Sequence, residues 1–258
     1  MQAAKTTTSH QTVAISGAGS GIGQALAVHF AKQNWQVVLI GRRPSALQAT
    51  EALCRDQAPS RAIMMCPLDL STQDAQAKAE AWIHQTNLKS LDALINNAGQ
   101  FVRGETLSAD LADWTRLYEV NVLGPLRLTR AFYPLLRQSR GAILNISSTL
   151  GLKGTADTVA YSASKAALNN WAQAFAVQAA RDGVRVNTIC PGLVDTPIHS
   201  FHEAADKEKT LEQLRHLQPL GRVGRPEDLT SLAYALCASG SEWTTGAMLN
   251  IDGGIHLV

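Results

Sequence analysis

The sequence predicts an α/β fold: one doubly wound, mainly parallel seven-stranded sheet with helices on both faces. Short β-rich runs alternate with longer helical stretches along 258 residues, a length that one such domain can fill. Most of the β-rich runs are apolar throughout instead of alternating, which is typical of parallel strands covered on both faces. No Pro/Gly-rich linker, shift in composition or internal repeat divides the chain, so a single domain is expected.

The predicted strands are short runs rich in apolar and β-branched residues. In chain order they are TVAIS (12–16), QVVLI (36–40), AIMMC (62–66), DALIN (92–96), GAILNIS (141–147), VRVNTIC (184–190) and AMLNI (247–251). The stretches between them are longer and predict helices over 22–33, 45–57, 72–86, 111–137, 159–181 and 227–238. Such alternation of strand and helix gives a parallel sheet.

Two segments do not follow this alternation of strands and helices. Residues 1–10 are polar and are expected to form a flexible tail, so the domain is expected to span 11–258. Residues 195–220 are also more polar than their surroundings and directly follow a strand. A long excursion at that place is a candidate substrate lid.

Composition argues against several classes of function. The net charge is only +2 and the charges are scattered, so no nucleic-acid partner is expected. No apolar run is long enough to cross a bilayer, and the start lacks the apolar core of a signal peptide. The four cysteines lie far apart, which indicates reduced thiols in the cytoplasm. No metal site is expected, because His199 and His202 lack a further close ligand and are interpreted as solvated surface.

A glycine-rich turn, SGAGSGIGQAL (16–26), joins the first strand to the first helix. Glycines at such a turn let backbone N–H groups approach a phosphate, and the helix N-terminus adds a favourable partial charge. The strict G-x-G-x-x-G spacing is absent, and Gly17, Gly21 and Gly23 give a different pattern. A flexible loop would look similar, but the place between strand and helix favours a nucleotide site.

The end of the second strand distinguishes between nicotinamide cofactors. NAD sites usually have a carboxylate there to bond the ribose 2′-hydroxyl. This chain has Gly41 followed by Arg42 and Arg43, and a guanidinium can bind a 2′-phosphate bidentately. The alternative is a solvated loop, but together with the glycine turn the two arginines favour NADP(H).

Tyr161 and Lys165 in AYSASKAAL share one face of a predicted helix, about one turn apart. Such a pair occurs by chance on many helices with both tips in water. A cation near a phenol also favours the phenolate and lowers its pKa from about 10, which suits an acid/base. The pair alone leaves both interpretations open.

Taken together, the motifs resemble the classical short-chain dehydrogenase/reductase family over essentially the whole chain. The family's T-G-x-x-x-G-x-G corresponds to the glycine turn with Ser16 in place of threonine, and its Y-x-x-x-K to Tyr161 and Lys165. Its other motifs match Asn96-Asn97-Ala98-Gly99, Asn121 in YEVNVLGP, Ser148, Pro191-Gly192 and NIDGG (250–254). The resemblance implies a Rossmann fold, and a homotetramer in which helices 111–137 and 159–181 pack against their symmetry mates.

The resemblance also implies the residues of the cofactor site. Asp69 and Leu70 would hold the adenine, and Val194 and Thr196 the nicotinamide carboxamide. Asp69 could instead cap a helix that begins near Ser71. The residues expected to bind NADPH are Gly17, Ser20, Gly21, Ile22, Gly23, Arg42, Arg43, Asp69, Leu70, Asn97, Tyr161, Lys165, Val194 and Thr196.

For catalysis, the resemblance implies that Tyr161 exchanges a proton with the substrate oxygen while hydride moves between nicotinamide and carbon. Ser148 would hydrogen-bond the same oxygen, and its spacing to Tyr161 favours it over Ser147. Lys165 would hold the ribose and lower the pKa of the phenol. Asn121 would fix a water that relays protons to Lys165.

The substrate is expected to be a small ketone, aldehyde or secondary alcohol, selected by the lid and by the segment QFVRGETLS (100–108). The expected activity is that of a general NADP(H)-dependent carbonyl reductase. A regulator that senses NADPH without turnover is a remote alternative, which the presence of Ser148, Tyr161 and Lys165 disfavours.

A 3-oxoacyl-carrier-protein reductase is the second alternative, because the ending GRVGRPEDL…GAMLNIDGG resembles that subgroup. Such an enzyme needs a basic patch near the mouth of its site for the acidic carrier protein. Arg137 and Arg140 are candidates for that patch, but Ser139 and Asp182 stand where basic residues are expected.

Overall fold

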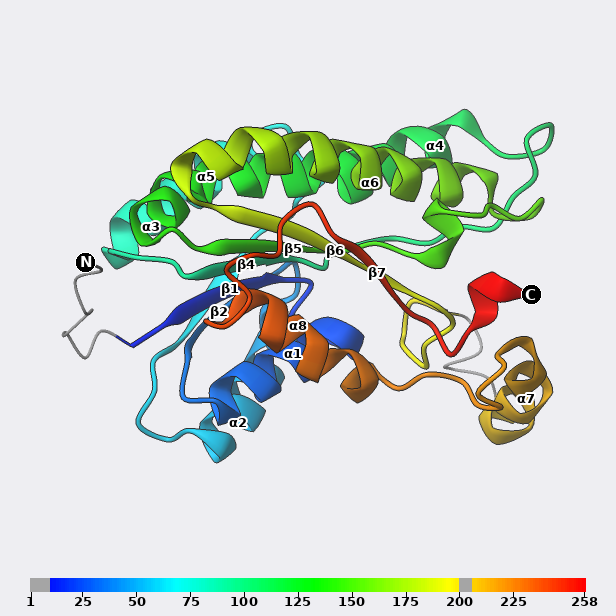
Figure 1. Cartoon of the computed structure of the whole chain (residues 1–258), viewed down its shortest axis with the longest axis horizontal. Helices are drawn as coiled ribbons and strands as arrows, with labels where there is room; N and C mark the ends of the chain where they lie inside the picture. Colours follow the sequence, from blue (N-terminus) through cyan, green and yellow to red (C-terminus); the bar gives the residue numbers. More distant parts are fainter. Residues whose placement is uncertain (1–9, 200–205) are drawn as a thin grey trace.

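Seven strands form one sheet at the centre of the molecule (Figure 1). The computed structural model describes residues 10–199 and 206–258. Its sheet has the order β3-β2-β1-β4-β5-β6-β7, and every neighbouring pair is parallel. The strands are β1 (Thr12–Ser16), β2 (Gln36–Gly41), β3 (Ile63–Pro67), β4 (Ala93–Asn96), β5 (Ala142–Ile146), β6 (Arg185–Pro191) and β7 (Met248–Ile251). The predicted doubly wound sheet is confirmed, and each predicted strand end lies within one residue of the observed one.

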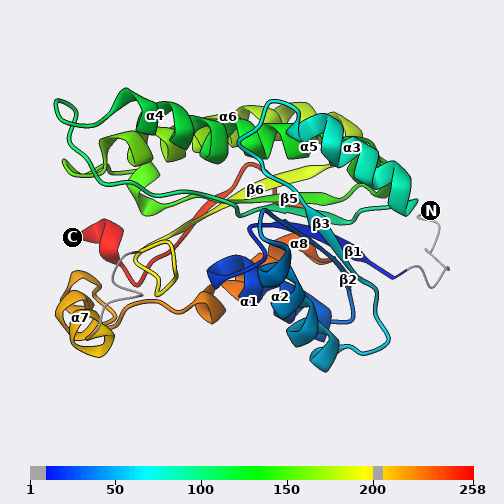
Figure 2. The ribbon, with the colours of Figure 1, turned by 180° about the vertical axis from the view of Figure 1, so that it is seen from behind.

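Helices cover both faces of the sheet (Figures 1 and 2). One layer consists of α1 (Gly21–Lys32), α2 (Pro44–Gln57) and α8 (Thr230–Cys237). The other consists of α3 (Ala75–Thr86), α4 (Leu111–Tyr118), α5 (Gly124–Ser139) and α6 (Val159–Ala179). A further helix, α7 (Lys207–Leu214), lies beyond the edge of the sheet in both views.

The sheet separates two hydrophobic cores because successive side chains of a strand point to opposite faces. In β1, Val13 and Ile15 belong to the core that includes α1, α2 and α8. Ala14 between them belongs to the core under α3, α5 and α6. All three side chains are fully buried, which explains why these strands read as continuous apolar runs.

An aromatic cluster joins α1 to α8. Phe30 packs edge-on against Trp35 and Tyr234, with ring centroids 5.1 Å and 5.3 Å apart. Offset and edge-to-face pairs of this kind stabilise a core beyond the area that they bury. The contact holds α8 against α1, and it thereby positions the segment that connects the predicted lid to α8.

The helix predicted over 111–137 is interrupted, so that prediction is wrong in detail. A π-helical turn, Glu119–Leu123, separates α4 from α5. Its hydrogen bond runs from the Gly124 N–H to the Glu119 carbonyl, one residue farther than in an α-helix. Pro125 contributes to the break because it has no N–H to offer the Asn121 carbonyl four residues earlier.

Other boundaries also differ from the predicted ones. Helix α3 starts at Ala75 instead of residue 72, and α8 starts at Thr230 after a 3-10 turn, Pro226–Leu229. The helix α7 inside the predicted lid was not expected. The predicted tail apart from His10, and residues 200–205 of the predicted lid, lie outside the described residues. Within the part that is described, no helix combines the length and hydropathy that a membrane span requires.

Replacing Phe132 by alanine tests the core under α5. Phe132 is fully buried in that core, so Phe132→Ala is expected to lower the free energy of unfolding by about 3–5 kcal/mol. Leu107→Ala is the control, because Leu107 is fully exposed and lies outside the helices expected at a subunit interface, and its effect is expected to stay within about 0.5 kcal/mol. Denaturant titration measures both, and similar losses for the two variants would contradict the described packing.

Candidate active site

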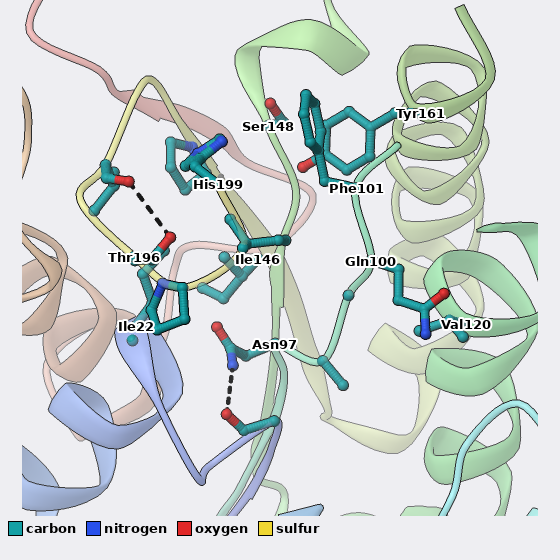
Figure 3. Close-up of a pocket in the computed structure, with 18 of the residues that line it drawn as sticks. Ile22, Asn97, Gln100, Phe101, Val120, Ile146, Ser148, Tyr161, Thr196 and His199 are labelled. Atoms are coloured by element: carbon teal, nitrogen blue, oxygen red, sulfur yellow. Dashed lines mark hydrogen bonds between the residues drawn. The ribbon is translucent and has the colours of Figure 1, made fainter. Parts of the chain in front are cut away.

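A cavity of about 880 Å³ runs along the carboxyl ends of the strands. The glycine turn and the end of β2 border it on one side, and β5, α6 and the start of the predicted lid on the other. Figure 3 shows Ser148, Tyr161, Phe101 and His199 together at one end, with Ile22 and Asn97 towards the other. Ligands of doubly wound sheets bind at this edge.

The glycine turn has the geometry of a phosphate cradle. Gly17 and Gly21 have φ angles of +66° and +54°, which L side chains rarely adopt. A Cβ on Gly23 would lie 2.3 Å from the Gly17 carbonyl oxygen and 2.4 Å from Asn97 Nδ2. Ser20 precedes the first turn of α1 in an extended conformation, and its side chain makes no capping bond. The first residues of α1 thus border the cavity, and the turn has no room for a side chain at Gly23.

Ser16 and Asn97 join this turn to the end of β4. The Ser16 hydroxyl accepts hydrogen bonds from the backbone N–H groups of Asn97 and Ala98, both at 3.0 Å. The Asn97 side chain donates to the Ser16 carbonyl at 2.9 Å, as Figure 3 shows. Asn97 lines the cavity, but its amide also holds the turn in shape.

The end of β2 carries the two arginines. Arg42 and Arg43 are exposed and border the cavity, and neither guanidinium group makes a hydrogen bond or ion pair with a described residue. Asp69 lies near them; its carboxylate accepts hydrogen bonds from the backbone and hydroxyl of Ser71 at 2.9 Å and 2.7 Å. Burial opposes ionisation, but these bonds and the charge of Arg42 outweigh it and lower the pKa of Asp69. Asp69 therefore caps the turn at Ser71, not α3 itself.

The expected catalytic residues come from two adjacent elements. Ser148 follows β5, and its hydroxyl accepts a hydrogen bond from the backbone of Leu150 at 3.1 Å. Tyr161 and Lys165 lie in the first two turns of α6. All three line the cavity and are less than 9% exposed. The neighbouring Ser147 also borders the cavity, and its hydroxyl donates to the Lys165 carbonyl at 3.4 Å.

The protonation of the pair differs from the sequence-based expectation. Burial raises the pKa of Tyr161 to about 12, although interaction with the Ser148 hydroxyl lowers it. Burial also lowers the pKa of Lys165 to about 8. The Lys165 ammonium donates to the Ile146 carbonyl at 3.0 Å and lies 5.8 Å from the centre of the phenol ring. The expected lowering of the phenol pKa by Lys165 is thus wrong for the protein alone, because desolvation dominates.

The π turn places Asn121 inside the protein, where it is fully buried. Its side chain accepts from the Gln100 N–H at 2.8 Å and donates to the Gln100 carbonyl and to Ser164, both at 3.0 Å. The side chain is therefore engaged by protein groups. A Cβ on Gly99 would lie 3.4 Å from Asn121 Oδ1 and 3.6 Å from Lys165 Nζ, so glycine lets these two residues approach.

The remaining expected cofactor residues line the same cavity. Val194 and Thr196 are buried, and the Thr196 hydroxyl donates to the Val194 carbonyl at 3.4 Å. The Thr196 side chain lies against Gly21, where an added Cβ would come within 3.2 Å of it. Ile22 and Leu70 border the cavity from the turn and from the end of β3. The structure thus brings every expected cofactor residue except Gly23 to the wall of one cavity, and Gly23 packs behind the turn against Gly17 and Asn97.

Phe101 and His199 border the cavity, although the sequence predicted a site role for neither of them individually. Their rings pack edge-on, with centroids 5.4 Å apart. Burial and the nearby Arg103 lower the pKa of His199 to about 4. The interpretation of His199 as solvated surface is therefore wrong, because Phe101 and the cavity wall cover it. The position of Phe101, two residues after Gly99, could have indicated that it borders the site. No local sequence pattern indicates the same for His199.

The candidate basic patch lies at the wrong edge of the sheet. Arg137 and Arg140 stand at the C-terminal end of α5, just before β5 begins. The amino ends of parallel strands lie opposite their carboxyl ends, where the cavity is. Within one chain, Arg137 and Arg140 therefore do not border the mouth of the site. Asp182 accepts a hydrogen bond from Tyr133 at 2.8 Å at that same edge.

The four cysteines lie inside the protein. Cys54, Cys66, Cys190 and Cys237 are free thiols and are all buried. Among the described residues, no group of three or more His, Cys, Asp or Glu side chains could hold a metal ion.

Comparisons with known proteins agree with the geometry. A family model described as enoyl-(acyl carrier protein) reductase matches residues 17–256. Meso-2,3-butanediol dehydrogenase of Serratia marcescens is 31% identical over 245 residues, which cover 95% of this chain and 94% of the relative. A short-chain type dehydrogenase/reductase of Mycobacterium marinum has a TM-score of 0.85 at 26% identity, with 96% of each chain covered. L-sorbose reductase of Gluconobacter frateurii, solved with NADPH and L-sorbose, has a TM-score of 0.89 at 26% identity, covering 96% of this chain and 97% of its own.

Gly23→Ala tests the cradle. The new Cβ would collide with the Gly17 carbonyl, so we expect a loss of about 1–3 kcal/mol in unfolding free energy and weaker NADPH binding. Gly154→Ala is the control, because its Cβ would come no closer than 3.3 Å to another atom. Thermal unfolding and NADPH fluorescence titration measure the two effects. Unchanged NADPH affinity in Gly23→Ala would show that the turn does not hold the cofactor.

Proposed function

The chain belongs to the short-chain dehydrogenase/reductase family, and from that premise we propose that it transfers hydride between NADP(H) and a carbonyl or secondary alcohol substrate. The observation that carries the proposal is the convergence of Ser148, Tyr161 and Lys165 at one end of a cavity whose other end holds Arg42 and Arg43. A general carbonyl reductase is the activity that these residues support best.

The preference for NADP(H) rests on the end of β2. Two exposed guanidinium groups border the cavity there, and Gly41 stands where an NAD site would carry an acid. The nearest carboxylate, that of Asp69, is engaged by Ser71. The glycine turn fits a dinucleotide because Gly17, Ser20 and Gly21 border the cavity at the N-terminus of α1, where a phosphate is favoured.

In this mechanism NADPH, when bound, supplies the hydride. Tyr161 is protonated at neutral pH, as a phenol with the ordinary pKa of about 10 is, and burial raises its pKa further to about 12, so it holds a proton to give to the carbonyl oxygen. Ser148 lies beside it, and its hydroxyl can donate to the same oxygen and stabilise the developing charge. Lys165, held by the Ile146 carbonyl, provides a positive charge next to the phenol and a donor for the ribose. The Asn121 carbonyl, which has no α-helical partner because of Pro125, can hold a water on the path to Lys165.

The other hypotheses have less support. The acyl-carrier hypothesis loses its candidate patch, because Arg137 and Arg140 lie at the opposite edge of the sheet from the cavity, although the matching family model is described as an acyl-carrier-protein reductase. A regulator without turnover would not need the three catalytic groups. The cytoplasmic location remains a prediction, and so does the homotetramer, for which the exposed Val177 on α6 gives modest support.

Tyr161→Phe is expected to remove the proton donor and leave the fold intact. Phenylalanine keeps the ring that packs on Phe101 and lacks only the hydroxyl. Turnover with NADPH and a reducible ketone is expected to fall by about 10²–10⁴-fold, with NADPH affinity largely kept. Tyr133→Phe is the matched control, since Tyr133 bonds Asp182 at the far edge, and it should retain activity. Near-full activity in Tyr161→Phe would refute the assignment.

The cofactor preference is tested by initial rates with NADPH and NADH. If the arginines contribute about 1.4 kcal/mol, kcat/KM is expected to favour NADPH by about tenfold. Gly41→Asp combined with Arg42→Leu should reverse the order, because it removes an attraction and adds a repulsion. Arg43 retains part of the phosphate affinity, so the reversal is expected to be incomplete.

Arg55→Leu on α2 controls for the loss of an exposed arginine, because Arg55 pairs with Glu51 and does not border the cavity. Equal use of both cofactors by the unmodified protein would show that Arg42 and Arg43 are a solvated loop. The hydride-transfer proposal would survive that result, but the NADP(H) assignment would not.

A further inference from the structure

The end of the cavity beyond the catalytic residues has a largely apolar wall. Its side chains come from the segment after β4, from the turn after Ser148, from the start of the predicted lid and from α7 with the turn that follows. They are Phe101, Val102, Leu150, Ile198, Leu214 and Leu217. Segments far apart in the sequence thus place aliphatic and aromatic side chains around the part of the cavity where a substrate must lie.

Phe101 is the centre of this wall. Its ring packs edge-on against the rings of Tyr161 and His199, with ring centroids 4.9 Å and 5.4 Å apart, respectively. Figure 3 shows these rings and Ser148 around the same end of the cavity. A group attached to a carbonyl carbon that is held by Ser148 and Tyr161 would therefore lie against Phe101.

The charged side chains that border this end are already paired within the protein. Arg103 forms an ion pair with Asp157, and Asp157 also accepts a hydrogen bond from Thr155 at 2.9 Å. Arg116 pairs with Asp113 at 2.6 Å. These pairs use part of the hydrogen-bonding capacity of the charged groups, so a hydroxylated substrate finds fewer partners here than it has in water.

Further polar side chains border this end, and the hydroxyls of Thr155 and Thr158 bond each other at 2.8 Å. His199 is uncharged near neutral pH, since its pKa is lowered to about 4, and it presents a flat ring to Phe101. The Gln100 side chain lies next to Val120, away from Ser148 and Tyr161 (Figure 3). The wall around the catalytic hydroxyls thus favours carbon over hydroxyl groups.

We propose that Phe101 and His199 select a carbonyl substrate that carries an apolar ring or bulky hydrocarbon group next to the reacting carbonyl, in preference to a sugar or polyol. The inference rests on the proposed function, since it specifies the substrate class of that same site. An aromatic or aliphatic group would lose its contact with water against this wall, and that gain rises with the area buried.

A matched pair of diones tests the proposal. 1-Phenyl-1,2-propanedione and 2,3-butanedione share the carbonyl beside the methyl group and differ by a phenyl in place of the second methyl. We expect kcat/KM with NADPH to be at least about tenfold higher for the phenyl compound, and activity with L-sorbose to be lower than with either. A ratio at or below one, or a preference for L-sorbose, would overturn the inference while leaving hydride transfer established.

Variants of the wall identify the residues responsible. Phe101→Ala should bring the ratio of the two kcat/KM values to within about threefold of one. Phe101→Leu should give an intermediate ratio, and it carries the same test if the alanine variant does not fold. His199→Ala should lower the ratio and His199→Phe should preserve it. The ratio is the readout because Phe101 contacts Tyr161, and a loss of overall rate cancels from it.

Leu107→Ala is the matched control, since Leu107 belongs to the same segment but is fully exposed and does not border the cavity. Its ratio should equal that of the unmodified protein. An unchanged ratio in both Phe101 variants would overturn the inference. NADPH that binds but is oxidised with none of the three carbonyl compounds would refute the proposed function and this inference with it.

Discussion

The hydrogen bonds between the ends of β1 and β4 hold the site together. These strands are neighbours at the place where the strand order reverses, and the chain leaves them in opposite directions. The Ser16 hydroxyl receives two backbone N–H groups from beyond β4, and the Asn97 side chain returns a bond to the Ser16 carbonyl. These bonds fix the glycine turn, which should hold the cofactor, to the segment that contains Gly99. Gly99 in turn lies against the side chains of Lys165 and Asn121. Cofactor and catalytic groups can keep one geometry because this link is short and buried.

Burial shifts the pKa values of both Tyr161 and Lys165, and it does so for the same physical reason. Removal from water disfavours charge, which raises the pKa of Tyr161 and lowers that of Lys165. Both pKa values remain above neutrality, by a wide margin for the phenol and a narrow one for the amine. The protein alone therefore holds a neutral phenol next to a lysine that is largely cationic at pH 7. Such a site is better prepared to give a proton than to accept one.

Much of the fold and of the site could be predicted because the relevant signals are local. Apolar runs such as TVAIS report burial on both faces, and the spacing of Tyr161 and Lys165 places them on one helix face. The contact between Phe101 and His199 depends on how two loops meet, which no local pattern encodes. The pKa of Tyr161 likewise depends on burial by distant segments, so the effect of Lys165 alone was a poor guide. The π turn lies between these cases, since Pro125 marks a break but not its type.

The π turn also limits how the length of the chain can vary. A π turn takes up one extra residue within a helix, so loss of one residue between Glu119 and Leu123 would close it to an ordinary helical turn. Asn121 would then leave Gln100 and Ser164, because the turn is what places its side chain between them. A substitution here disturbs one side chain, whereas a deletion removes the backbone shape that presents Asn121. Descendants of this chain should therefore vary in sequence across the segment far more readily than in its number of residues.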